Sequence, residues 1–295
     1  MFPPSRGCRP VNPALTVVPL PHGRMLTLGG KPLVMGIVNV TPDSFSDGGK
    51  NLDPIAAIDG ALAMESEGAA IIDIGGESTR PGAATVSVDE ELDRVIPVIE
   101  GVRRRSGITI SVDTRKSAVA DAALDRGADI INDVSALRFD PAMGAIAARG
   151  GAAVILMHMR GEPATMQDHI QYENLLDEIR SELATFRIDA QAMGITSDRL
   201  LVDPGIGFGK TFEQNLEILS NLRAFSEMAP LVVGASRKAF VGRLTGKDGG
   251  RARMAGSLAA VAAAWLGHAS IVRVHDVAET VDFLEVFHPI AEAIA

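Results

Sequence analysis

Short apolar runs recur along the chain from residue 33 onwards. Each run is nearly continuous and rich in β-branched residues, and a polar segment separates it from the next. The runs lie at residues 33–40, 69–75, 108–114, 129–134, 152–158, 199–205, 230–236 and 270–276. Continuous apolar runs of this length are typical of strands that are buried on both faces of a parallel sheet.

The segments between these runs have helical periodicity. We expect helices at residues 53–68, 89–105, 115–126, 141–149, 171–193, 211–225, 253–267 and 277–294. Asp53 is suited to cap the first helix and Gly68 to end it. The second has acidic residues in its first turn and basic residues in its last, which complements the helix dipole, and Pro97 is expected to interrupt or kink it.

A strand followed by a helix, repeated eight times, predicts an α/β fold of the (β/α)8 or TIM-barrel type. A doubly wound sheet is the structural alternative, but the first strand lacks a Gly-x-Gly-x-x-Gly turn after it. We expect residues 1–15, which are rich in proline, to be disordered or loosely packed. Residues 16–33 predict a hairpin that closes one end of the domain, and residues 34–295 the barrel itself.

Polar residues gather at the carboxyl ends of the predicted strands. They are Asn39, Asp73, Asp113, Asn132, Asp133, His158, Asp203, Ser236, Lys238, Arg273 and His275. In barrels of this kind the loops after the strands converge on one face, and that face holds the active site. We interpret His158, which stands between two methionines, as a core residue rather than a ligand.

The acceptors in this set suit a flat heterocycle that carries several N–H groups. Asp113 and Asp203 provide carboxylates, and Asn132 provides an amide that can bind a ring edge with both donors and acceptors. Two simpler interpretations stay open. Asp113 could cap the following helix, and Asp203 could stabilise the turn at the Pro-Gly that follows it.

The cationic residues predict a site for phosphate groups. Arg80, Lys238, Arg273 and His275, together with Asn39 and a divalent metal, could hold a diphosphate. Arg80 could instead be a solvated loop charge. The polar composition of the loops at 40–53 and 75–88 indicates that they act as lids over the site. The alternative is that they are plain surface connections.

Composition excludes several classes of partner. The 295 residues carry a net charge of −9, so a nucleic-acid partner is not expected. The most apolar stretch, 258–266, is too short to cross a membrane. Cys8 is the only cysteine, and a chain that cannot form an internal disulfide is expected in a reducing compartment, the cytoplasm.

The motifs at these strand ends resemble those of the dihydropteroate synthase family. They are MGIVNVTPDSFSDGG (35–49), DIGGESTRPGA (73–83), SVDT (111–114), NDVS (132–135), LMHMRG (156–161), DPGIGFGK (203–210), GASRKAFVG (234–242) and RVHDV (273–277). The resemblance is specific because all these motifs occur in the family's order. It runs from about residue 33 to the end, and it departs mildly at Ala235 and Ala239, where the family often has Thr and Ser.

The resemblance implies a transferase of folate biosynthesis. Such an enzyme joins 7,8-dihydropterin-6-ylmethyl diphosphate to 4-aminobenzoate with Mg2+, and releases 7,8-dihydropteroate and diphosphate. It also implies inhibition by sulfonamides and a homodimer formed through helices near the C-terminus, where residues 254–267 are apolar on more than one face.

The resemblance assigns a role to each site residue. The pterin site would comprise Asp113, Asn132, Met157, Asp203, Lys238 and Arg273. The diphosphate would meet Asn39, Arg80, Arg273 and His275, with Asn39 as the magnesium ligand. The 4-aminobenzoate site would comprise Phe45, Thr79, Pro81, Gly207, Phe208 and Ser236. The residues expected to act in catalysis are Asp47, Asp113, Asp203 and Lys238.

Three other functions are compatible with parts of the pattern. A corrinoid-linked methyltransferase barrel also binds pterins, but it needs no diphosphate site. A catalytically silent pterin-binding paralogue would not need the retained Arg80, Asp47 and Lys238. A sugar-phosphate aldolase would place its lysine within a strand, whereas Lys238 follows one.

Overall fold

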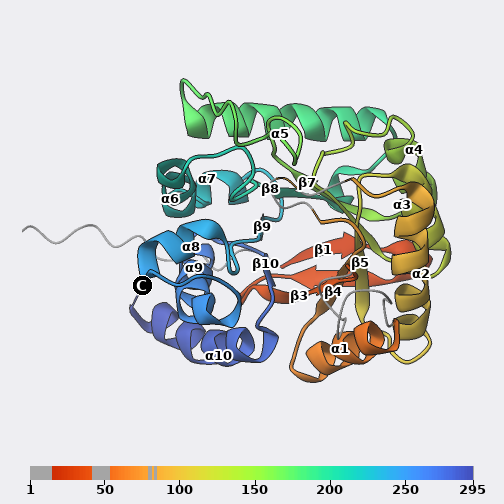
Figure 1. Ribbon diagram of the computed structural model, residues 1–295, viewed down its shortest axis with the longest axis horizontal. Helices are drawn as coiled ribbons and strands as arrows, with labels where there is room; N and C mark the ends of the chain where they lie inside the picture. Colours follow the sequence, from red (N-terminus) through yellow and green to blue (C-terminus); the bar gives the residue numbers. More distant parts are fainter. Residues whose placement is uncertain (1–14, 42–53, 79–81, 83–84, 295) are drawn as a thin grey trace, which may run out of the picture.

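The computed structural model describes residues 15–41, 54–78, 82 and 85–294. A ring of helices surrounds a central set of strands (Figure 1). The strands of the central sheet are β3 (Leu33–Asn39), β4 (Ile71–Gly75), β5 (Thr109–Asp113), β6 (Ile130–Asp133), β7 (Ala153–Met157), β8 (Leu200–Asp203), β9 (Val232–Val233) and β10 (Ile271–Val274). The helices around it are α1 (Pro54–Ser66), α2 (Val88–Arg103), α3 (Ser117–Asp125), α4 (Met143–Gly150), α5 (Leu175–Ala192), α6 (Phe212–Ser220), α7 (Arg223–Ser226), α8 (Ala239–Thr245), α9 (Met254–Leu266) and α10 (Val277–Ile294).

The eight strands form one parallel sheet in the order β8-β7-β6-β5-β4-β3-β10-β9. A parallel bridge between Val202 and Leu231 joins the two edges, so the sheet closes into a barrel. The predicted (β/α)8 barrel is therefore confirmed. Every residue of β4, β6, β7, β8 and β9 is buried, which explains why these strands show no alternation of polar and apolar positions.

The predicted hairpin is also confirmed, and it closes the amino-terminal end of the barrel. Its strands are β1 (Thr16–Pro19) and β2 (Met25–Leu28), linked by the short helix η1 (Pro21–Gly23). In β2, Leu26 and Leu28 are buried while their neighbours are exposed, as expected for a strand with one face on a core. This face packs on residues at the start of the barrel strands, including Met35, Ile71 and Ile155.

An ion pair fastens the hairpin to the barrel. Asp129, which is buried just before β6, receives Arg24 from the hairpin at 2.6 Å and Arg103 from α2 at 2.8 Å. The same carboxylate accepts a hydrogen bond from the backbone N–H of Ile110 in β5. These three donors hold the Asp129 carboxylate at the amino-terminal end of the barrel. The polar residues at the carboxyl ends of the strands lie at the opposite end.

Several helix boundaries differ from the prediction. The segment 211–225 forms two helices, α6 and α7, and the unpredicted α8 follows β9 before α9 begins. Helix α5 starts at Leu175 rather than 171. Pro97 does not interrupt α2, which continues to Arg103. Gly68 lies beyond the end of α1 with a φ of +100°, while Asp53, the expected cap, is outside the described residues.

Two 3-10 turns, η2 (Ser197–Arg199) and η3 (Gly250–Arg253), complete the described elements. Within the described residues, no helix has the length and apolar character needed to span a bilayer.

Candidate active site

The register of the barrel places four predicted or neighbouring site positions in one row. Asn39 pairs with Gly75, Gly75 with Asp113, and Asp113 with Asn132. Residues paired in this way across parallel strands point to the same side of the sheet. The carboxyl ends of β3 to β6 therefore bring an amide, a carboxylate and a second amide to one level.

Arg273 from β10 crosses the barrel and joins this row. Its Nε donates to Asp73 Oδ2 at 2.5 Å, and its Nη2 donates to Asp113 Oδ2 at 2.7 Å. Asn132 Nδ2 donates to the same Asp73 oxygen at 3.2 Å. The guanidinium thus has a fixed orientation between two carboxylates, which leaves its flat face available to a ligand.

The environment of Asp113 makes it titrate near neutral pH. Burial raises the pKa of this carboxyl to about 7, although the Arg273 guanidinium opposes the shift. The fully buried Asp73 adds a second negative charge nearby, which raises the pKa further. A carboxyl that changes charge near pH 7 is a characteristic of functional sites. The helix-cap interpretation of Asp113 is wrong, because Lys116 occupies the cap position of α3.

The turn role considered for Asp203 is confirmed, and its role toward a ligand stays a prediction. Its Oδ1 accepts a hydrogen bond from Gly205 N–H at 2.7 Å, so it does stabilise the turn after β8. Burial raises its pKa, while Lys238 and Arg273 lower it, which shows that both cations lie close to the carboxylate. Asp203 therefore anchors a loop and lies close to the two cations.

Lys238 lies at the start of α8 and faces the aromatic ring of Phe208. Its Nζ stands 4.1 Å from the ring centroid. Burial and the neighbouring Arg273 lower the pKa of Lys238 to about 8, although the Asp203 and Asp113 carboxylates raise it. The ammonium is thus present at neutral pH and lost in mildly alkaline solution.

Ser236 and His275 form a separate pair at the ends of β9 and β10. The Ser236 hydroxyl oxygen accepts a hydrogen bond from the His275 backbone N–H at 3.2 Å and lies 3.1 Å from Nδ1 of the ring. Burial and the nearby Arg237 and Arg273 lower the pKa of His275 to about 4. The expectation that His275 contributes a cation is wrong for the free protein, in which the imidazole is neutral.

The remaining described site residues line an apolar part of the same face. Met157 and Phe208 pack together with Val134, Met159 and Met166 in one small buried cluster. Gly207 precedes Phe208 and adopts a φ of +83°, where a side chain would be strained. An aromatic ring beside a half-buried ammonium is a suitable wall for a flat ligand.

Five predicted site residues fall outside the described part of the chain. They are Phe45, Asp47, Thr79, Arg80 and Pro81. Their roles stay predictions, as do the lid roles of the loops that carry them. Asn39 is described, is half-buried, and ends β3.

The sequence did not assign a role to Asp73, which the structure pairs with Arg273. It begins the DIGGESTRPGA motif at the end of β4, and this position was its only signal. A carboxylate that orients another side chain, rather than contacting a ligand, has no motif of its own in a single sequence. Its Oδ1 is buried and has no hydrogen-bond partner among the described residues.

Comparison with known proteins agrees with this geometry. Residues 35–275 match the family model described as pterin binding enzyme. The chain is 47% identical over 262 residues to a dihydropteroate synthase of Synechocystis, which covers 88% of this chain and 90% of that protein. The chain belongs to the dihydropteroate synthase family.

Solved structures of dihydropteroate synthases have the same fold. The Yersinia pestis enzyme with a sulfonamide drug complex superposes with a TM-score of 0.87 at 44% identity, covering 92% of this chain and 98% of that one. The Xanthomonas albilineans enzyme with 4-aminobenzoic acid gives a TM-score of 0.86 at 45% identity, covering 93% and 98%. The fold is therefore shared along nearly the whole length of both chains.

Proposed function

We propose that the chain condenses 7,8-dihydropterin-6-ylmethyl diphosphate with 4-aminobenzoate to form 7,8-dihydropteroate and diphosphate. The observation that carries this proposal is the buried arrangement in which Arg273 bridges Asp73 and Asp113 beside Asn132. Membership of the dihydropteroate synthase family supports it independently.

The pterin would bind between the row of polar strand ends and Arg273. Asp113 and Asp203 would accept hydrogen bonds from N–H groups on the edge of the ring, and the Asn132 amide would both accept and donate. Lys238 would donate a hydrogen bond to the carbonyl oxygen of the ring. The flat guanidinium of Arg273 would stack on the ring face, with Met157 as the apolar floor. Two carboxylates in one cavity require two nearby cations, which Lys238 and Arg273 supply.

The diphosphate would bind at the carboxyl ends of the neighbouring strands β3 and β10, which carry Asn39, Arg273 and His275, with Arg80 from the neighbouring loop. Magnesium prefers oxygen ligands and keeps several waters, so one protein amide plus diphosphate oxygens can hold it. Asn39, half-buried at the end of β3, offers such an amide oxygen. A bound magnesium ion would neutralise charge that develops on the departing diphosphate. The neutral His275 would donate a hydrogen bond there rather than a full charge.

The 4-aminobenzoate would lie against Gly207, Phe208 and Ser236, with Phe45, Thr79 and Pro81 completing its site. In the reaction the bond from the pterin methylene carbon to the diphosphate oxygen breaks, and the aniline nitrogen forms the new carbon–nitrogen bond and loses a proton. The carboxylates Asp47, Asp113 and Asp203 would stabilise positive charge on the pterin as the leaving group departs. No protein nucleophile is needed.

A sulfonamide should inhibit the enzyme in competition with 4-aminobenzoate. Sulfonamides share the aniline ring and an anionic group with that substrate, so both should occupy the space beside Phe208. Initial rates measured over a matrix of sulfamethoxazole and 4-aminobenzoate concentrations check this. Inhibition that competes with the pterin substrate instead, or no inhibition at all, would contradict the assignment of this wall of the site.

We infer that two copies of the chain associate through α9 and α10. Leu266, Val286 and Ile290 are more than half exposed on these helices and would supply the apolar contact between the two copies. Light scattering should give twice the 31.0 kDa of one chain, and Val286→Asp with Ile290→Asp should give the single mass. A wild-type mass of one chain would contradict the dimer.

The single Cys8 favours the cytoplasm as the compartment, which cell fractionation would check.

A further inference from the structure

The loop from β8 to α6, residues 204–211, has a backbone that would be flexible by itself. Gly205, Gly207 and Gly209 have φ values of +70°, +83° and +60°, which favour glycine. The loop also packs backbone against backbone. A Cβ on Gly205 would lie 2.0 Å from the carbonyl oxygen of His158, and one on Gly209 would lie 2.7 Å from that of Arg160. Glycine is required for this contact, but glycine does not hold the loop in place.

Three side chains fix the loop by its consecutive carbonyl groups. Gln167 Nε2 donates to Gly207 O at 3.0 Å, Lys210 Nζ donates to Phe208 O at 2.9 Å, and the Tyr172 hydroxyl donates to Gly209 O at 3.2 Å. Gln167 and Tyr172 come from the chain between β7 and α5, whereas Lys210 belongs to the loop itself. The carbonyls on both sides of Phe208 are therefore restrained from outside the loop.

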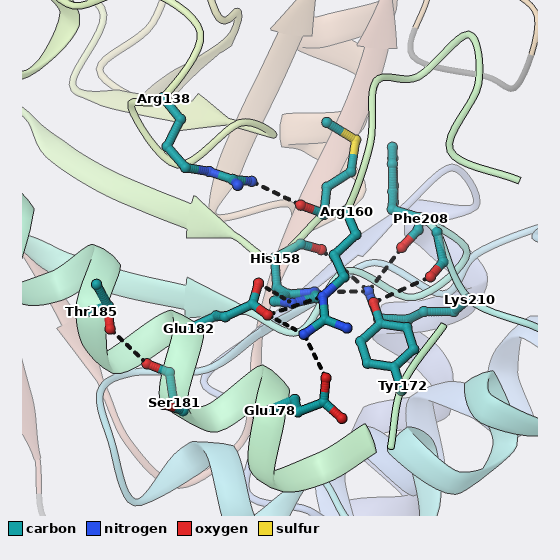
Figure 2. A network of polar contacts seen from close by, with 12 residues as sticks. Arg138, His158, Arg160, Tyr172, Glu178, Ser181, Glu182, Thr185, Phe208 and Lys210 are labelled. Carbon is teal, nitrogen blue, oxygen red and sulfur yellow. Dashed lines mark hydrogen bonds and ion pairs between the residues drawn. The ribbon is translucent and has the colours of Figure 1, made fainter. Parts of the chain in front are cut away.

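Lys210 is the buried centre of this set, with 2% of its surface exposed. Besides Phe208 O, its Nζ contacts His158 O at 3.3 Å and His158 Nδ1 at 3.1 Å (Figure 2). Every one of these partners is neutral. Burial lowers the pKa of Lys210 to about 7, while Asp203 partly offsets this shift. A buried ammonium with neutral partners needs a further source of negative charge.

His158 connects the ammonium to that charge. Its ring is fully buried, and its Nε2 lies 3.1 Å from Glu182 Oε2. Because Nδ1 accepts from Lys210, the proton of the neutral ring belongs on Nε2, where it donates to Glu182. Arg160 holds the carboxylate from the other side through Nε at 3.0 Å. Figure 2 shows Lys210, His158 and Glu182 in sequence, with Arg160 and Tyr172 beside them.

We propose that Lys210 is a positioning residue for 4-aminobenzoate. Its ammonium, held by His158 and through it by Glu182, fixes the carbonyl of Phe208, so that Gly207 and Phe208 stand where the substrate ring binds. This inference rests on the proposed function, because it takes the wall beside Phe208 as the 4-aminobenzoate site. Lys210 bonds directly to the Phe208 carbonyl, whereas it affects the pterin residue Asp203 only through its charge, so its loss should weaken 4-aminobenzoate binding more than pterin binding.

Lys210→Met tests the proposal, because methionine fills a similar volume and cannot donate. Steady-state kinetics should show the KM for 4-aminobenzoate raised about tenfold or more, since displacing a substrate wall by about 1 Å has large effects. Titration of the pterin substrate should give a smaller change in its Kd, because the only effect on the pterin side is the lost positive charge near Asp203. Arg103→Met is the matched control, because Arg103 also joins a loop carbonyl to a carboxylate, but at the opposite end of the barrel. It should lower thermal stability and leave both KM values unchanged.

Two weaker variants keep the test decisive if Lys210→Met does not fold. Tyr172→Phe and Gln167→Ala each remove one donor to the same loop, and each should raise only the KM for 4-aminobenzoate, by about two- to fivefold. An unchanged KM for 4-aminobenzoate in folded Lys210→Met, or in both weaker variants, would overturn the inference. Wild-type protein without turnover would instead reject the proposed function, so the two failures are distinct.

Discussion

Asp113→Asn is expected to lower kcat/KM for the pterin substrate about a thousandfold, which corresponds to about 4 kcal/mol. The amide has the same shape as the carboxylate, but it cannot accept two N–H groups as an anion does. It also removes one of the two carboxylates that orient Arg273. Both the contact with the ring edge and the stacking cation are therefore weakened by one substitution. Steady-state kinetics with 4-aminobenzoate saturating provides the measurement.

The pH dependence of pterin binding distinguishes this role from a general loss of packing. The pKa of Asp113 is raised to about 7, so the anion dominates above that pH and is lost as the pH falls below it. Wild-type affinity for the pterin should therefore decrease toward acidic pH. In Asp113→Asn this part of the profile should flatten, although Asp203, whose pKa is also raised, keeps its own dependence.

Asp121→Asn is the matched control for this prediction. Asp121 lies on α3, which follows β5, and pairs with Arg149 on the outer surface. The same chemical change there should leave kcat/KM within about twofold, because surface ion pairs contribute little. A loss of less than about threefold in Asp113→Asn would mean that Asp113 does not contact the pterin.

Lys238→Met is expected to reduce kcat/KM for the pterin substrate by about two to three orders of magnitude. The ammonium lies near Asp203 and Asp113, and its removal leaves Asp113 with Arg273, and Asp203 with Arg273 and Lys210, as compensating cations. The pKa of Lys238 is lowered to about 8, so wild-type affinity should also decrease above that pH. Titration calorimetry across the pH range should show this alkaline decrease in wild type and not in the variant.

Lys247→Met is the corresponding control, since Lys247 is an exposed residue just beyond α8. It should retain wild-type kinetics and the alkaline decrease. Retention of activity in Lys238→Met would show that the ammonium only packs against Phe208, and it would remove Lys238 from the pterin site.

The fold could be predicted from the sequence because its signals are local and repeated. Strands such as β7 are buried on both faces, and a continuous apolar run is visible without knowledge of the partner strands. Boundaries were harder where tertiary contacts decide them. Helix α8 begins directly after Lys238 in a segment that carries site residues, and its short apolar pattern resembles a loop connection.

The residues that point into the site could be predicted because barrel topology places every strand end on one face. Asp113, Asn132 and Arg273 were found in this way and do meet. Their charge states could not be predicted. His275 looks like a cation in the sequence, but burial among arginines keeps it neutral. The pairing of Asp73 with Arg273 spans 200 positions and has no local signature.

The residues that support the site from outside it, such as Lys210 and Glu182, were the hardest to predict from the sequence. His158 was correctly interpreted as a core residue, but its link between Lys210 and Glu182 depends on three segments that meet only in the folded chain. A buried lysine in a glycine-rich loop has several roles in proteins, and sequence spacing does not distinguish them. The hydrogen bonds from Lys210 to His158 O and Phe208 O, on which the proposed positioning role rests, form only in the folded chain.

The most direct test of the central claim is formation of 7,8-dihydropteroate by the purified chain from the pterin diphosphate, 4-aminobenzoate and magnesium. Product and diphosphate should form in equal amounts, with no product when either substrate is omitted. Pterin binding without any product would contradict the claim and identify a silent pterin-binding protein, and absence of pterin binding would show that the site itself has been misassigned.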